Sequence, residues 1–144
     1  MNAAGIALGV QATINRYAHA GDRGDAEELA GLFLEDGVLE AAHGVLARGR
    51  AAIRDYLGRL ADAEALERPA FVRHHVSDID VVRGEPGRAE VRSYFLVVTD
   101  RGIDHSGRYR DILVLDVDGV WRFERRSVRL DAPPLSRIFT IAYP

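Results

Sequence analysis

Residues 14–25 read INRYAHAGDRGD, and this stretch joins an apolar helical stripe to a carboxylate. Every fourth residue from Ile6 to Ala18 is apolar, and the next residue in that series is Asp22. On one continuous helix these positions lie along a slowly turning face, so Asp22 stands where an apolar residue is expected. A carboxylate at a helix C-terminus also meets the negative end of the helix dipole, at a cost of roughly 0.3–1 kcal/mol. Asp22 is therefore either a solvated turn residue at a frayed helix end or a functional residue.

The composition predicts one domain spanning residues 1–144, because a chain of 144 residues that is 47% hydrophobic can bury a core of its own. The net charge is -3, and no window gathers basic and aromatic residues, so we expect no nucleic-acid partner. The N-terminus lacks a basic region and turns polar at Gln11, too early for a signal peptide or a membrane span. We therefore expect a cytoplasmic protein without a membrane partner.

Two residue types are absent from the chain, and their absence limits its chemistry. Without cysteine there are no disulfides, thiolate nucleophiles or cysteine-based metal sites. All 19 basic residues are arginines, so Schiff-base catalysis and a phosphate-binding P-loop lysine are excluded. The five histidines show no HExxH or other ligand spacing, and we expect no metal. Histidines, carboxylates and tyrosines remain as proton carriers.

Apolar residues at helical spacing predict helices over residues 4–20, 26–34 and 50–65. Gly21 or Gly24 can end the first helix, and Asp25 can then cap the second, with Glu28 as its capping-box partner. The first two helices thus form a hairpin with Asp22 at the bend.

Alternating apolar residues predict six strands, two short and four long. The Asp118-Gly119 turn between two of them is a strong hairpin signal, so the second half of the chain is an antiparallel meander. We predict an α+β fold in which the N-terminal helices pack on one face of a strongly curved antiparallel sheet. An apolar tail over residues 133–144 is expected to pack on this sheet or on a second subunit, in a homodimer or homotrimer. The predicted strands span residues 38–42, 45–48, 71–82, 88–99, 105–117 and 120–130, and the tail contains Leu135, Ile138, Phe139 and Ile141.

The alternation also predicts which polar residues face inward. His74 shares a face with two valines, whereas His75 lies on the opposite face. In the next-to-last strand, His105, Tyr109 and Asp111 continue an apolar face, which is typical of a pocket wall rather than a closed core. In the last strand, Trp121 and Phe123 face inward, and Trp121 is large enough to shape a cavity. The same alternation places Glu124 and Arg126 on the outside, so the arginines of WRFERR should form a solvated or interfacial face.

Three segments together resemble the SnoaL-like branch of the NTF2-like superfamily: RYAHAGDRGDAEELAGLFLEDGVLE, RHHVSDIDV and SGRYRDILVLDVDGVWRFERR. The resemblance spans about residues 12–131. It implies a cone-shaped α+β barrel with an interior pocket. Enzymes of this branch include scytalone dehydratase, lindane dehydrochlorinase, bile-acid dehydratase and polyketide cyclases, which resemble one another in a His-Asp pair inside the cone. The fold hosts many chemistries, so the resemblance specifies the fold better than the function.

Carried over to this chain, the resemblance places the catalytic pair at Asp22 and His74 and the tyrosine that holds a substrate oxygen at Tyr17. The asparagine of the family's His-x-x-x-Asn strand is replaced here by Asp78. A lone histidine at position 74 would more often be a core residue bonded to a backbone carbonyl, but the match to Asp22 favours a functional pair.

Four further residues are candidates for substrate binding: Tyr109, Asp111, His105 and Trp121. His105 is the candidate second histidine by strand register, but it lies near a strand start, where it can be solvated. Tyr109 can equally be wall structure, and Asp111 can instead pair with an arginine such as Arg125.

These residues suit proton abstraction followed by loss of water, isomerisation or ring closure, without a cofactor. We therefore expect a lyase or isomerase of the dehydratase or cyclase type that acts on a small hydrophobic oxygenated ring compound. The alternative is a non-catalytic module that binds a hydrophobic ligand or supports oligomerisation. A third reading, the small subunit of a ring-hydroxylating dioxygenase, would require a longer chain. A histidine–aspartate hydrogen bond favours the enzyme, whereas bulky side chains filling the cone favour the non-catalytic module.

Overall fold

The helix that carries Asp22 does not fray before it. In the computed structural model, which describes residues 1–67, 69–136 and 143, helix α1 (Ala3–Arg23) runs three residues beyond its predicted end. Gly24 stops it in a left-handed conformation, with φ of 64°, and donates its N–H to the carbonyls of the last turn. Asp22 therefore lies in the final turn of a regular helix, with its side chain directed by the helix rather than by a loop.

Helix α2 (Ala26–Gly31) starts as predicted but ends three residues early. The Asp25 side chain accepts a hydrogen bond from the backbone N–H of Glu28 at 3.0 Å, which confirms the cap. The Glu28 carboxylate pairs with Arg23 instead of closing the capping box. Strand β1 (Phe33–Ala41) begins where the helix was expected to continue, because the carbonyl of Leu32 accepts a sheet hydrogen bond from Phe123 at 2.8 Å.

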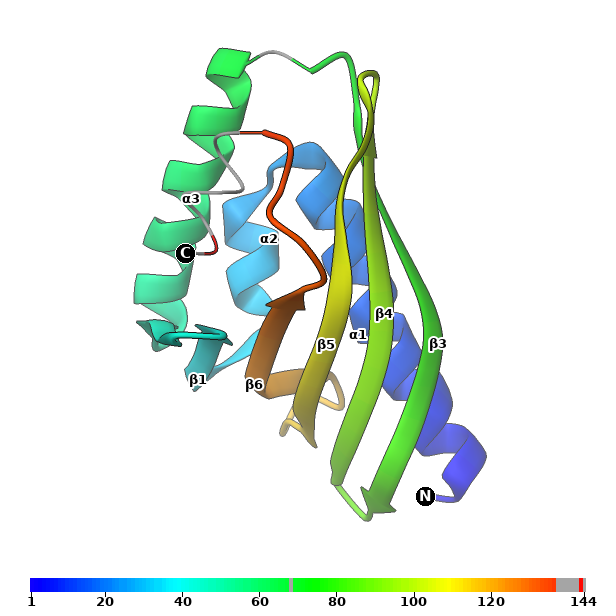
Figure 1. Cartoon of the computed structure of the whole chain (residues 1–144). Coiled ribbons are helices and arrows are strands. Elements are labelled where there is room, and N and C mark those ends of the chain that lie inside the picture. Colours follow the sequence, from blue (N-terminus) through cyan, green and yellow to red (C-terminus); the bar gives the residue numbers. More distant parts are fainter. Residues whose placement is uncertain (68, 137–142, 144) are drawn as a thin grey trace.

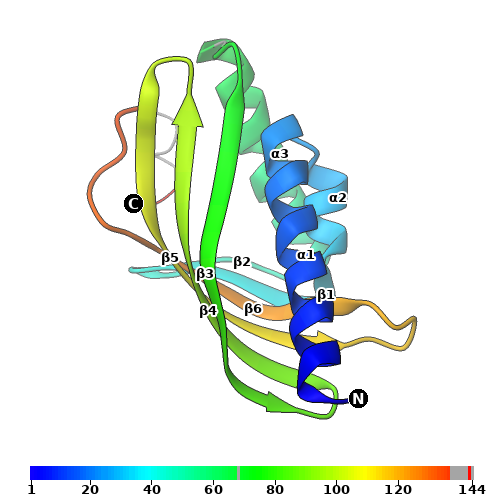
Figure 2. The same ribbon diagram turned by 90° about the vertical axis from the view of Figure 1, so that its right-hand side faces the viewer.

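Six strands form one curled, unclosed sheet in the order β2-β1-β6-β5-β4-β3 (Figure 1). The predicted meander of the second half is confirmed, since β3 to β6 pair antiparallel in chain order. The sheet is not antiparallel throughout, because β1 pairs parallel with β6. Figure 2 shows that the long strands bend and that the three helices lie on one side of them. The other elements are β2 (Gly44–Arg48), α3 (Arg50–Glu67), β3 (Val72–Glu85), β4 (Arg88–Thr99), β5 (Gly102–Leu115) and β6 (Trp121–Leu130).

The prediction that Arg126 faces solvent is wrong. Between β5 and β6, Arg125 pairs with Ile112 and Phe123 pairs with Leu113, so Glu124 is an extra residue in β6. Such a bulge interrupts the two-residue alternation of a strand. Phe123 and Arg126 consequently lie on the same inner face, and both are fully buried. Arg125 stays on the outer side, where it pairs with Glu40.

A second bulge explains why the side chain of Asp78 is exposed. The pairing of β3 with β4 shifts between Ser77 and Asp80, and Asp78 adopts a positive φ of 54°. Its exposed carboxylate accepts a hydrogen bond from the Ser77 hydroxyl at 2.7 Å and does not reach the interior. His74 and His75 lie before this bulge and face inward and outward as predicted.

The predicted apolar tail is described only in part. Leu135 is exposed, and Tyr143 packs against the edge of the core. The other three apolar residues of the tail, Ile138, Phe139 and Ile141, lie outside the described residues. In the part of the chain that the structure describes, no helix is both long and apolar enough to cross a membrane.

Candidate functional site

The last turn of α1 and the start of β3 bring together two residues that are 52 positions apart. One oxygen of the Asp22 carboxylate lies 2.8 Å from Nδ1 of His74 and also accepts the backbone N–H of His74 at 2.7 Å. Both side chains are 15% exposed. Because a carboxylate only accepts hydrogen bonds, Nδ1 carries the proton in the neutral ring, and Nε2 keeps its lone pair. Nε2 has no hydrogen-bond partner among the residues described.

The electrostatics of Asp22 follow from this contact. Burial by itself would raise the pKa of the carboxyl group. The hydrogen bonds and the charge of His74 outweigh burial and hold the pKa of Asp22 below its usual range. Asp22 is therefore ionised at neutral pH and can fix the orientation and tautomer of the imidazole.

Gly21 gives the imidazole room to approach α1. A Cβ atom at this position would lie 3.1 Å from Cε1 and 3.4 Å from Nδ1 of His74. Most real Cβ contacts are longer, so a larger residue would require the ring of His74 to shift by a few tenths of an ångström. The glycine before the aspartate is thus part of the geometry that forms the pair, although it carries no functional group.

A narrow cavity of about 50 Å³ lies beside the histidine ring. Its walls include His74, Tyr17 and Tyr109, together with Glu64 and Tyr143. Burial raises the pKa of Tyr17, with the charge of Arg126 acting in the opposite direction, and burial likewise raises the pKa of Tyr109. Both phenols therefore remain protonated at neutral pH. They can donate hydrogen bonds to an oxygen atom placed in the cavity.

Behind the tyrosines lies an ion pair that the sequence did not reveal. Arg126 donates two hydrogen bonds, of 3.0 and 3.1 Å, to the two oxygens of Asp111, and both side chains are 0% exposed. The guanidinium carbon lies 3.6 Å from the ring centroid of Tyr109 and 4.3 Å from that of Tyr17. Nη1 of Arg126 is buried and has no hydrogen-bond partner in the described part of the chain. Asp111 thus pairs with Arg126, not Arg125, and a positive charge lies behind both phenol rings.

His105 has a carboxylate of its own. Its Nδ1 lies 2.7 Å from an oxygen of Asp104, and both residues are buried. Adjacent residues of a strand normally point to opposite faces, but Asp104 is an extra residue where the pairing of β5 with β4 shifts. Burial lowers the pKa of His105, and the hydrogen bond that its ring donates to Asp104 acts in the opposite direction. His105 is therefore not a solvated residue at a strand start.

Trp121 lies away from the cavity. Its indole packs on α1, where a Cβ atom at Gly9 would lie 2.3 Å from Cδ1 of the ring. The carbonyl of Trp121 accepts a hydrogen bond from Thr13 at 2.6 Å. Trp121 is not among the described residues that line the cavity, so the structure brings together Tyr17, His74 and Tyr109 but not Trp121.

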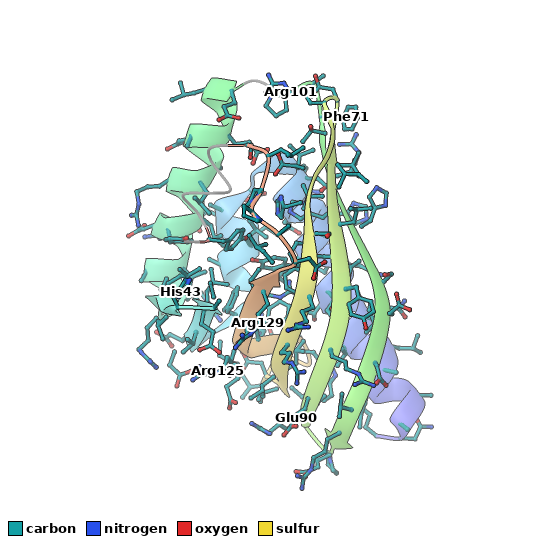
Figure 3. The ribbon with its side chains drawn as sticks, viewed as in Figure 1. His43, Phe71, Glu90, Arg101, Arg125 and Arg129 are labelled. Carbon is teal, nitrogen blue, oxygen red and sulfur yellow. The ribbon has the colours of Figure 1, made fainter. Side chains whose placement is uncertain are left out.

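A larger hollow of about 330 Å³ lies at the same end of the molecule. It extends from the end of α3, at Glu64 and Glu67, to the β4–β5 hairpin, where Figure 3 shows Arg101 at the tip. Its lining also includes apolar side chains, the hydroxyl residues Thr99 and Ser136, and Asp104. Within the described ranges, no group of three or more histidine, aspartate or glutamate residues is placed to hold a metal ion.

Comparison with known proteins places this chain in a family. A domain described as SnoaL-like matches residues 7–127. A protein of unknown function from Mycobacterium tuberculosis, solved as an aspartate-to-asparagine variant, is 34% identical, with a TM-score of 0.74 over 86% of this chain and 75% of that chain. A proposed scytalone dehydratase from Novosphingobium aromaticivorans is 30% identical, with a TM-score of 0.71 over 87% of this chain and 83% of that chain.

ActVI-ORFA from Streptomyces coelicolor shares the fold alone. It is 22% identical, with a TM-score of 0.76 over 89% of this chain and 96% of that chain. A further solved structure, from Nostoc punctiforme, is described as having a cystatin-like fold. No curated protein matches the chain.

Proposed function

The chain belongs to the SnoaL-like family, and we propose that it is a cofactor-independent lyase or isomerase that uses His74 and Asp22 as a general-base pair. The substrate class is a small hydrophobic oxygenated ring compound. The observation that carries this proposal is the 2.8 Å contact between Nδ1 of His74 and Asp22, which leaves Nε2 free to accept a proton beside a cavity. The similarity to a proposed scytalone dehydratase supports the dehydratase type.

The first step is removal of a proton from carbon. Nε2 of His74 takes the proton from a carbon next to a carbonyl group, and Asp22 stabilises the imidazolium that forms. A positioned base of this kind contributes about 10²–10⁴ in rate. Asp22 is well suited to the stabilising role because it stays ionised at neutral pH.

The negative charge then moves to the carbonyl oxygen, where Tyr17 acts. Its phenol is protonated and lines the same cavity as His74, so it can donate a hydrogen bond to the enolate oxygen. The charge of Arg126, 4.3 Å from the centre of the Tyr17 ring, makes this phenol a better donor. In a dehydration, the enolate expels a hydroxyl group from the adjacent carbon, and the proton on His74 leaves with it as water. In an isomerisation, the same proton returns to a different carbon.

One observation weighs against catalysis inside the cone and favours a second candidate, a non-catalytic module of the same fold. The cavity beside His74 measures only about 50 Å³, whereas ligand pockets usually span about 300–1,000 Å³. Aromatic side chains and Arg126 occupy much of the space inside the curled sheet. An enzyme with this interior can admit only the reacting edge of a ring, with the remainder in the larger hollow outside.

Proton abstraction can be tested without knowing the natural substrate. The bicyclic ketone 1-tetralone is incubated with the protein in D₂O, and exchange of the protons next to its carbonyl is followed by NMR. We expect His74→Gln to lower the exchange rate by about 10²–10⁴ and Asp22→Asn to lower it less. His75→Gln is the matched control, because its side chain lies exposed on the opposite face of the strand. Unchanged exchange in both test variants would refute the base pair, and binding without exchange would support the non-catalytic module.

A further inference from the structure

One carboxylate lies where the cavity and the outer hollow meet. Glu64, in the last turns of α3, lines the small cavity with His74 and Tyr17, and it also lines the 330 Å³ hollow with Asp104 and Val72. The end of α3 and the β4–β5 hairpin rise at the same end of the molecule (Figure 1), which gives the hollow its two sides. Glu64 is the one described residue that lines both the cavity and the hollow.

The other carboxylates of the hollow already have partners. Asp104 accepts hydrogen bonds from His105 and from the backbone N–H of Ser136 at 3.1 Å. Glu67 lies 4.0 Å from Arg101, which also donates to the Glu67 carbonyl. Among the described residues, none forms a hydrogen bond or an ion pair with Glu64, although its side chain is partly buried. A partly buried carboxylate without a protein partner has lost some of its hydrogen bonds to water. A hydrogen bond donated by a ligand can replace them.

The charged groups around Glu64 determine whether the ligand can be an anion or a neutral hydrogen-bond donor. The charged and titratable groups that act on it are His74, Asp22, Asp104 and Glu67, and three of these four are carboxylates. Burial raises the pKa of Glu64, and the three carboxylates act in the same direction. Arg101, the one cation in the described lining of the hollow, already pairs with Glu67. An anionic group beside Glu64 would therefore be repelled by the carboxylates, whereas a neutral hydroxyl group can donate a hydrogen bond.

The remaining lining of the hollow suits a ring. Pro69, Val72, Ile103 and Leu135 supply apolar surface around a volume within the range of small-molecule pockets. We propose that the hollow binds the far end of the substrate's ring system and that Glu64 accepts a hydrogen bond from a hydroxyl group carried there. This inference rests on the proposed function, because it assumes that the reacting edge of the same compound reaches His74.

Two probes that differ in one donor test the proposal. The compounds are 6-hydroxy-1-tetralone and 6-methoxy-1-tetralone, and their dissociation constants are measured by isothermal titration calorimetry. We expect the wild-type protein to bind the hydroxy compound about tenfold more tightly, as for a hydrogen bond to a charged group. Glu64→Leu should abolish this preference, and Glu64→Gln should keep part of it because an amide oxygen still accepts. Asp62→Asn, an exposed change on the same helix, should leave it unchanged.

The outcomes separate this inference from the proposed function. A preference that persists in Glu64→Leu would overturn the role of Glu64, as would equal affinity or no binding of either probe in the wild-type protein. The exchange assay with 1-tetralone reports on His74 independently. If the hydroxyl preference depends on Glu64 but no exchange occurs, the inference about the hollow stands and the catalytic proposal fails.

Discussion

The buried ion pair between Asp111 and Arg126 gives the sharpest prediction for stability. Both side chains are fully shielded from solvent, and the two hydrogen bonds between them are 3.0 and 3.1 Å long. Asp111→Asn keeps the shape but removes the counter-charge, so the guanidinium is left charged among the rings of Tyr109 and Phe123. Removing one partner of a buried pair typically destabilises a protein by about 3–5 kcal/mol. For a chain of this length we therefore expect the Tm to fall by about 10–17 °C.

The measurement is urea unfolding followed by the fluorescence of Trp121, which is 3% exposed in the folded chain. The double variant Asp111→Leu/Arg126→Met should recover most of the loss of stability, since apolar residues can replace a buried ion pair at little cost. Glu124→Gln is the control, because the side chains of its pair with Arg88 are 42% and 44% exposed, and such a pair should contribute less than about 1 kcal/mol. A free energy of unfolding for Asp111→Asn within about 1 kcal/mol of the wild-type value would refute the reasoning.

Two further predictions concern the histidines. Gly21→Ala should lower the 1-tetralone exchange rate, because the new methyl group requires the ring of His74 to shift. Helix propensity favours alanine by about 1 kcal/mol, and the close contact with the ring opposes that gain. Equal exchange in the variant and the wild-type protein would contradict the prediction. The lowered pKa of His105 means that the unfolded chain takes up a proton first as the pH falls below about 6.5. The stability contributed by neutral His105 is present above that pH and is lost as the pH falls toward the pKa of the folded state. Urea unfolding at several pH values should therefore show a smaller loss on acidification in His105→Gln than in the wild-type protein, whereas the exposed His19→Gln should match the wild-type protein.

Local sequence signals were sufficient for most of the fold. The helical spacing of apolar residues, the Asp25 cap and the Asp118-Gly119 turn each act over a few neighbouring residues, and each predicted the element that the structure contains. Where such a local signal gave a wrong prediction, a local pattern was the cause. The second helix was predicted too long because Leu32 and Phe33 continue its apolar spacing, but their backbone is needed for pairing with β6.

Asp22 and His74 could be predicted as a candidate pair from the sequence, because each departs from the pattern of its neighbours. Asp22 interrupts an apolar stripe, and His74 shares a strand face with apolar residues, so both violate their local patterns. The family resemblance then connected two positions that no local rule relates. The contact of 2.8 Å between them required the tertiary structure, because it depends on α1 packing against β3.

The sequence by itself determined the helices, the meander and the inward direction of His74. These features follow from the spacing of apolar residues along a helix and from their alternation along a strand, which neighbouring residues are sufficient to show. Only the tertiary structure decided that Arg126 lies in the core, that Asp104 meets His105 and that Glu64 stands between two cavities. The first two depend on bulges, each of which shifts the alternation of one strand by one residue. A bulge is fixed by how two distant strands pair, so the alternation within a single strand does not predict it. The position of Glu64 likewise follows from where α3 rests against the sheet.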